Sequence, residues 1–154
     1  MRVLAVDPGE KRLGIALSDP SGTIANPLTV LQHVARAVDA AAIAQLASQY
    51  EAGLILVGQA LDEENQPTPQ SRRAARLAEA IRQQTDLPVK CWDETGSTAA
   101  ARSARLAMGV SRRKRRGHLD DLAATYILQT FLDENPNADD GALPSKADPT
   151  PTNG

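Results

Sequence analysis

The amino-acid sequence predicts an α/β protein built on a mixed sheet, in which an antiparallel meander is followed by parallel strands and helices cover both faces. Two short apolar segments near the N-terminus are joined by a Pro8-Gly9 turn, which is typical of a hairpin. Apolar segments then alternate with segments of helical spacing, the order expected of strand-helix-strand units. The 154 residues fit a single domain.

The predicted meander lies at the start of the chain. Residues 3–7 and 12–18 are expected to be strands, and the short connection between them favours an antiparallel hairpin. A third short strand is expected within residues 23–31, where Asn26-Pro27 interrupts it.

An alanine-rich helix is expected to follow, from Ala35 to about Glu51, with Gly53 ending it. Its helical spacing places on one face Val38, Ala42, Ile43 and Leu46. The continuous apolar run over residues 54–57 is typical of a strand covered on both faces.

The second half of the chain continues the alternation after an exposed polar loop at 62–69. A helix is predicted over 70–84 and a strand over 87–94. The inward residues of that helix are Ala74, Leu77, Ala78 and Ile81. Two further helices are expected at 97–108 and 118–133, with a basic loop at 110–117.

The C-terminal residues differ in composition from the rest. Residues 1–133 are expected to form the folded domain. Residues 134–154 hold four prolines among acidic and small polar residues, and we expect a disordered acidic tail because such a segment cannot bury a core.

Composition excludes several classes of protein. No apolar run approaches the roughly 18 residues that a membrane span needs. The single cysteine, Cys91, excludes an internal disulfide and a cysteine-clustered zinc site. A charged residue comes too early for a signal peptide, so a cytoplasmic protein is expected.

Carboxylates stand at the ends of predicted buried elements. Asp7 follows a buried strand, Asp93 and Glu94 end another, and the carboxyl ends of parallel strands meet at one edge of a sheet. The ordinary alternative for Asp7 is a turn-forming residue before Pro-Gly. Three carboxylates gathered at one point need a divalent cation or a strong upward shift in pKa, and oxygen ligands select Mg²⁺ or Mn²⁺.

Asp120 and Asp121 open the last predicted helix, where acids also pair favourably with the helix dipole. Asp120 shares a face with Ala124, Ile127 and Phe131, whereas Asp121 shares a mixed face. An inward carboxylate is costly unless it is paired or holds a cation. Asp120 is therefore the better candidate ligand, while the residues alone do not choose between Asp93 and Glu94.

Basic residues flank these acids, in the arrangement that a nuclease needs to hold a phosphate backbone. Lys11 and Arg12 follow Asp7, and a run that contains no acid precedes Asp120. The core of that run is Arg112, Arg113, Lys114, Arg115 and Arg116. A merely solvated charge run is the alternative. Aromatic residues are few and none is interleaved with the run, so backbone and shape recognition is expected instead of base stacking.

The motif at residues 6–16, Val-Asp-Pro-Gly-Glu-Lys-Arg-Leu-Gly-Ile-Ala, resembles the opening motif of the YqgF (RuvX) family. The later motifs of the family have counterparts here in the same order, at residues 25–28, in the Trp-Asp-Glu at 92–94 and in the segment 117–129. The resemblance covers residues 1–133 and implies a ribonuclease H-like fold. It also implies that the metal-binding acids are Asp7, Glu94 and Asp120.

The resemblance implies a metal-dependent nuclease, an enzyme that hydrolyses phosphodiester bonds of structured nucleic acid. Structured RNA is favoured, in 5′-end processing of pre-16S rRNA, because no evident dimer helix supports symmetric cutting of branched DNA. A Holliday junction resolvase is the alternative, and the oligomeric state, monomer or weak homodimer, is left open. Thr95 stands where the family has arginine, which favours a third alternative, a catalytically weak nucleic-acid-binding module.

Overall fold

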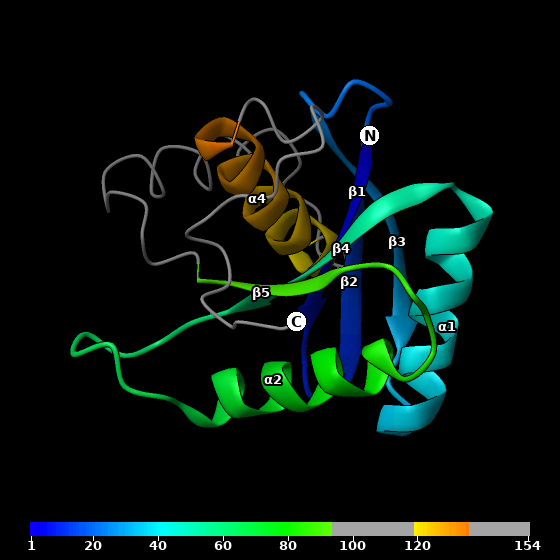
Figure 1. The fold of residues 1–154 in the computed structure, drawn as a ribbon. Coiled ribbons are helices and arrows are strands. Elements are labelled where there is room, and N and C mark those ends of the chain that lie inside the picture. The colour runs from blue at the N-terminus through cyan, green and yellow to red at the C-terminus, as the bar shows by residue number, and fades with distance from the viewer. Residues whose placement is uncertain (94–118, 136–154) are drawn as a thin grey trace.

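The computed structural model describes residues 1–93 and 119–135, and the side chains of residues 119–121 fall outside the description. Its centre is a five-stranded sheet in the order β3-β2-β1-β4-β5 (Figure 1). The meander consists of β1 (Arg2–Pro8), β2 (Arg12–Ser18) and β3 (Ala25–Gln32), paired antiparallel. Then β4 (Ala52–Gln59) and β5 (Val89–Asp93) extend the sheet in parallel. This arrangement confirms the predicted mixed sheet.

Two apolar clusters lie on opposite faces of the sheet, because side chains alternate along each strand. Leu4, Val6, Ile55 and Val57 pack beneath α1 (Arg36–Gln49) and α2 (Pro69–Arg82). The opposite face, which includes Leu54 and Leu56, packs against α4 (Leu119–Glu134). The prediction of a strand buried on both faces at 54–57 is therefore confirmed.

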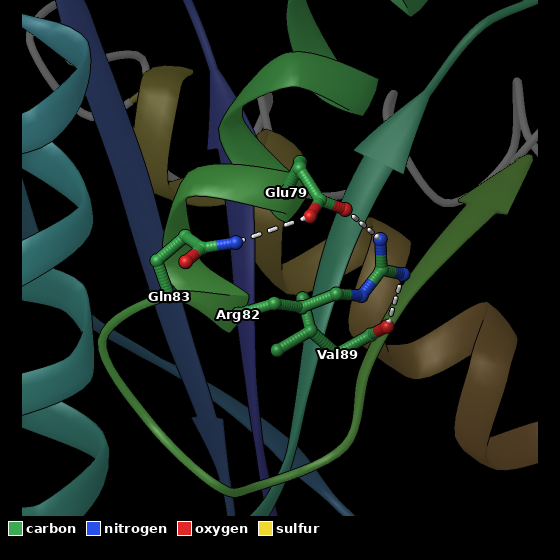
Figure 2. A network of polar contacts seen from close by, with 4 residues as sticks. All are labelled: Glu79, Arg82, Gln83 and Val89. Atoms are coloured by element: carbon green, nitrogen blue, oxygen red, sulfur yellow. Dashed lines mark hydrogen bonds and ion pairs between the residues drawn. The ribbon is translucent and has the colours of Figure 1, made fainter. Parts of the chain in front are cut away.

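Helix α2 has the inner face that its spacing predicts, since Ala74, Leu77, Ala78 and Ile81 are all buried. Its last turn is tied to β5 by the contacts in Figure 2. There Arg82 donates from Nη2 to the carbonyl oxygen of Val89 at 2.6 Å and pairs with Glu79 at 3.3 Å. Arg82 therefore has a structural role at the end of the helix.

The predicted inner face of α1 is partly wrong. Val38 is 51% exposed, and the buried residues are Asp39, Ala40, Ile43 and Ala47. Asp39 can be buried because its carboxylate accepts from the Val34 amide at 3.1 Å and contacts Nδ1 of His33 at 2.5 Å. A satisfied acid thus takes an inward position that the apolar spacing assigned to Val38.

Two local expectations also need correction. Gly53 does not end α1; it lies inside β4, where a Cβ would come within 2.6 Å of the Met1 side chain. The reversal after the helix is made instead by Glu51, with φ of 59°. Strand β3 is not broken at Asn26-Pro27 but continues through a register shift between Ile15 and Ala16 of its partner strand.

None of the helices in the described part of the chain combines the length and the apolarity needed to cross a membrane.

Candidate functional site

Asp7 is the residue before the last one of β1, at the carboxyl end of the central parallel pair of strands. Val3 and Ala5 belong to the apolar cluster beneath α4, and side chains alternate along a strand. Asp7 is therefore on the α4 face of the sheet, where it is half-buried. It stands opposite Gly14 of β2, which has no side chain to crowd that position.

Asp93 ends β5 on the other face of the sheet. Val89 and Cys91 pack with the cluster beneath α1 and α2, whereas Trp92 packs with the α4 cluster. Because Asp93 alternates with Trp92, it shares the face of Val89 and not that of Asp7. Glu94 lies outside the described residues.

Gly58 allows α4 to lie close to the sheet at this end. Gly58 pairs with Trp92 of β5, and it follows Val57, the partner of Val6. A Cβ at Gly58 would come within 2.4 Å of Ile127 Cδ1, so any larger residue would force the helix away. The close approach places the middle of α4 beside the carboxyl end of β4.

The face of α4 that is predicted to carry Asp120 includes the buried residues Ala124, Ile127 and Phe131. The neighbouring side, in line with Asp121, is also buried at Leu128 and Leu132. Asp120 is in the first turn of the helix, seven residues or about two turns before Ile127, and its side chain is outside the description. Figure 1 shows α4 beginning over the middle of the sheet and running toward the end where β1 starts. Its first turn is therefore on the side toward the carboxyl end of β1.

Trp92 fixes β5 against α4. Its Nε1 donates to Thr130 Oγ1 at 3.0 Å, and its ring meets Phe131 edge to face with centroids 5.1 Å apart. This packing gives Trp92 a structural role. It also holds the strand that leads into Glu94 at a defined position relative to α4.

The predicted phosphate-binding residues are only partly described. Lys11 and Arg12 are exposed in the turn between β1 and β2. This turn is tight, since the Gly9 amide donates to the Arg12 carbonyl at 3.0 Å and a Cβ at Gly9 would be 2.5 Å from that oxygen. The five basic residues at positions 112–116 lie outside the described residues.

Within the side chains that the structure describes, no three acidic, histidine or cysteine residues gather closely enough to hold a metal ion. Of the three predicted ligands, only the Asp7 side chain belongs to that set. Its oxygen chemistry suits Mg²⁺ or Mn²⁺, and the predicted partners are carboxylates as well.

A further group of basic residues was not expected from the sequence. Arg36 of α1 and Arg72, Arg73 and Arg76 of α2 line a cavity of about 470 Å³ beside the turn that follows Asp7. The available signal was the Arg-Arg-x-x-Arg spacing in residues 72–76, which places arginines on one side of a helix. That Arg36 joins them depends on how α1 and α2 pack.

Comparisons with known proteins agree with this architecture. A family model described as "RuvX: Holliday junction resolvase" matches residues 1–134. A relative from Thermoanaerobacter pseudethanolicus, named "Putative pre-16S rRNA nuclease", is 36% identical over 89% of this chain and 99% of its own. One of the same name from Desulforamulus reducens is 38% identical over 86% of this chain and 97% of its own.

Solved structures with the same arrangement are more distant in sequence. Thermus thermophilus RuvC in complex with a Holliday junction substrate has a TM-score of 0.56 at 15% identity, covering 88% of this chain and 96% of that one. The fowlpox virus resolvase with its Holliday junction has a TM-score of 0.52 at 12% identity, covering 87% and 98%. At these identities the likeness concerns the fold, and it confirms the ribonuclease H-like fold.

Proposed function

This chain belongs to the RuvX family of Holliday junction resolvases, and we propose that it is a metal-dependent nuclease that hydrolyses phosphodiester bonds of structured RNA, in 5′-end processing of pre-16S rRNA. The observation that carries the catalytic part is the position of Asp7, half-buried at the carboxyl end of β1 on the face that α4 covers. The relatives that are 36–38% identical and are named for pre-16S rRNA support the choice of substrate.

In this proposal Asp7, Glu94 and Asp120 hold Mg²⁺ or Mn²⁺. Divalent ions held by these carboxylates would supply the positive charge that activates water and stabilises the leaving oxygen in phosphodiester hydrolysis. Asp93 is set aside because it ends β5 on the face of α1 and α2. Asp120 is favoured over Asp121 on the family resemblance, because Leu128 and Leu132 in line with Asp121 are as buried as Ile127 and Phe131 in line with Asp120.

The basic residues supply substrate binding in the same proposal. Lys11 and Arg12 contact backbone phosphates beside Asp7, and Arg112, Arg113, Lys114, Arg115 and Arg116 contact phosphates from the segment before Asp120. Arginine suits this task because its planar guanidinium forms paired hydrogen bonds to phosphate oxygens. Such contacts hold the strand without reading its sequence.

The test compares two single substitutions at opposite faces of the sheet. Asp7→Asn is expected to lower kcat/KM on an end-labelled pre-16S rRNA fragment by roughly a hundredfold or more, because a metal-binding carboxylate contributes several kcal/mol to the transition state. Asp93→Asn, the matched control, is expected to stay within several-fold of the unchanged protein. Both are assayed with Mg²⁺ and with Mn²⁺, after circular dichroism has shown that they fold. Normal cleavage by Asp7→Asn would contradict the proposal.

A second candidate substrate is branched DNA, which the family's description as Holliday junction resolvases favours. The same preparations are therefore assayed on a four-way junction beside the RNA, and light scattering reports whether the protein is a dimer. Faster cleavage of the junction by a dimer would favour this second substrate. Binding of both substrates without cleavage in either metal would instead favour a non-catalytic module.

A further inference from the structure

The cavity beside the β1–β2 turn lies on the face of the sheet away from Asp7. It has a volume of about 470 Å³ and is lined by Pro8 and Gly9, by the start of α1 and by the first half of α2 as far as Leu77. Small-molecule pockets are mostly lined by apolar and aromatic side chains. Here the long side chains at the rim are those of Arg36, Arg72, Arg73 and Arg76. This cavity is therefore suited to a charged group and offers no tryptophan, tyrosine or phenylalanine on which a base would stack.

The positive charge of the cavity is largely uncompensated. Only Arg73 has an acidic neighbour among the described residues, the exposed Glu10 at 3.5 Å, while Arg36, Arg72 and Arg76 form no ion pair there. Asp39 is the one acid among the described lining residues. Its two oxygens are engaged by His33 and by the Val34 amide.

The spacing of the arginines adds a free-energy cost that a bound anion would offset. Arg72 and Arg76 are four residues apart on α2, where like charges repel each other. Arg72 lies in the first turn of α2, and Arg36 is the first residue of α1, at ends where the helix dipole disfavours cations. Bound phosphate would neutralise these groups, and guanidinium is the side-chain group that matches its oxygens best.

We infer that this cavity is a second phosphate-binding site, which holds a backbone phosphate of the nucleic acid next to the segment at Asp7. The inference rests on the proposed function. The nucleic-acid backbone is favoured over a free nucleotide because Gly9, which lines the cavity, is two residues from Asp7, at most about 7 Å of extended chain. Lys11 and Arg12 follow Gly9, so the segment that lines the cavity also carries two exposed basic residues.

The test measures binding without cleavage. In an Asp7→Asn background with EDTA, the double substitution Arg72→Gln and Arg76→Gln is expected to weaken binding of an RNA hairpin regardless of its sequence. It should also reduce the slope of log K against log salt by about 2. Glutamine retains helix propensity, so α2 is expected to remain folded. Arg2→Gln, which removes one charge at the opposite end of β1, is the control and should leave the slope nearly unchanged.

An unchanged salt slope in the double variant would overturn the inference, and so would a decrease that Arg2→Gln reproduces. Thermal unfolding with millimolar phosphate or nucleotide tests the alternative, in which the cavity binds a free phosphate group and not the nucleic-acid backbone. If phosphate or nucleotide stabilises the protein against thermal unfolding only when Arg72 and Arg76 are present, and the double variant binds RNA as before, the cavity is a site for small anions instead. If RNA binding depends on Arg72 and Arg76 but the protein with Asp7 unchanged cleaves no substrate, the proposed nuclease activity is wrong and the proposed phosphate site stands. If the protein binds no nucleic acid, the proposed nuclease activity and the proposed phosphate site are both wrong.

Discussion

Asp19 organises the turn between β2 and β3 through one carboxylate. It accepts hydrogen bonds from the amides of Ile24 at 2.9 Å and Thr23 at 2.7 Å and from the Ser21 hydroxyl at 2.5 Å. The Ile24 amide, followed by Ser21 and Thr23, holds the pKa of Asp19 well below its ordinary value, because each donor favours the ionised form. A single residue thus closes the meander that precedes the functional face.

This pKa predicts how Asp19 contributes to stability at different pH. Because the pKa is lower in the folded than in the unfolded protein, the contribution is fully present above about pH 4 and is lost as the pH falls through the folded value. Urea unfolding of the unchanged protein and of Asp19→Asn should differ by a constant free energy down to about pH 4, and by less below it. A difference that stays constant under more acidic conditions would contradict this prediction.

At the scale of elements, the start of α2 is held by a reciprocal cap. Thr68 Oγ1 accepts from the Ser71 amide at 3.0 Å, and Ser71 Oγ accepts from the Thr68 amide at 2.8 Å. The Thr68 hydroxyl also donates to the Ala60 carbonyl at 2.8 Å, just beyond β4. The cap therefore sets both the first residue of the helix and its position relative to the sheet.

Removing this cap should be measurable. Thr68→Ala is expected to lower the free energy of unfolding by about 1–2 kcal/mol, because the Ser71 amide and the Ala60 carbonyl both lose a partner. Thr68→Ser keeps the hydroxyl and should lose less than half as much. Chemical denaturation of the two variants checks the difference, and equal losses would show that the methyl group matters more than the hydrogen bonds.

At the scale of the whole molecule, two apolar clusters stabilise the sheet from opposite faces, and together they involve every described helix and strand. This organisation is consistent with one cooperative domain. Glu134 belongs to α4, and the residues after Asn135 remain a predicted tail on the basis of their four prolines and acidic composition.

A chain shortened to residues 1–135 tests that prediction. It is expected to unfold in one transition, with a free energy of unfolding within about 0.5 kcal/mol of the full chain, because the removed residues are predicted to bury no core. Chemical denaturation with two spectroscopic probes checks both points. A loss of several kcal/mol would mean that the C-terminal residues pack on the domain.

The sequence by itself determined the elements whose signal is local. The apolar run at 54–57, the face of α2 with Ala74 and Ile81, and the hairpin over residues 2–18 follow from periodicity and turn residues, which act over a few positions. Asp7 and Asp120 were proposed as metal ligands on the same kind of signal, because a strand end and a helix face are local features. The roles proposed for Glu94 and for the basic run at 112–116 rest on the sequence alone, because these residues lie outside the described part of the chain.

Which of these local features meet depends on how distant segments pack. Asp39 is buried in place of Val38 because His33 and the Val34 amide satisfy its carboxylate, a contact that apolar spacing does not encode. Asp93 separates from Asp7 because the parallel register with β4 places them on opposite faces of one sheet. Arg36 joins Arg72 and Arg76 around one cavity because α1 and α2 pack side by side, and packing between distant segments has no signature in either segment alone.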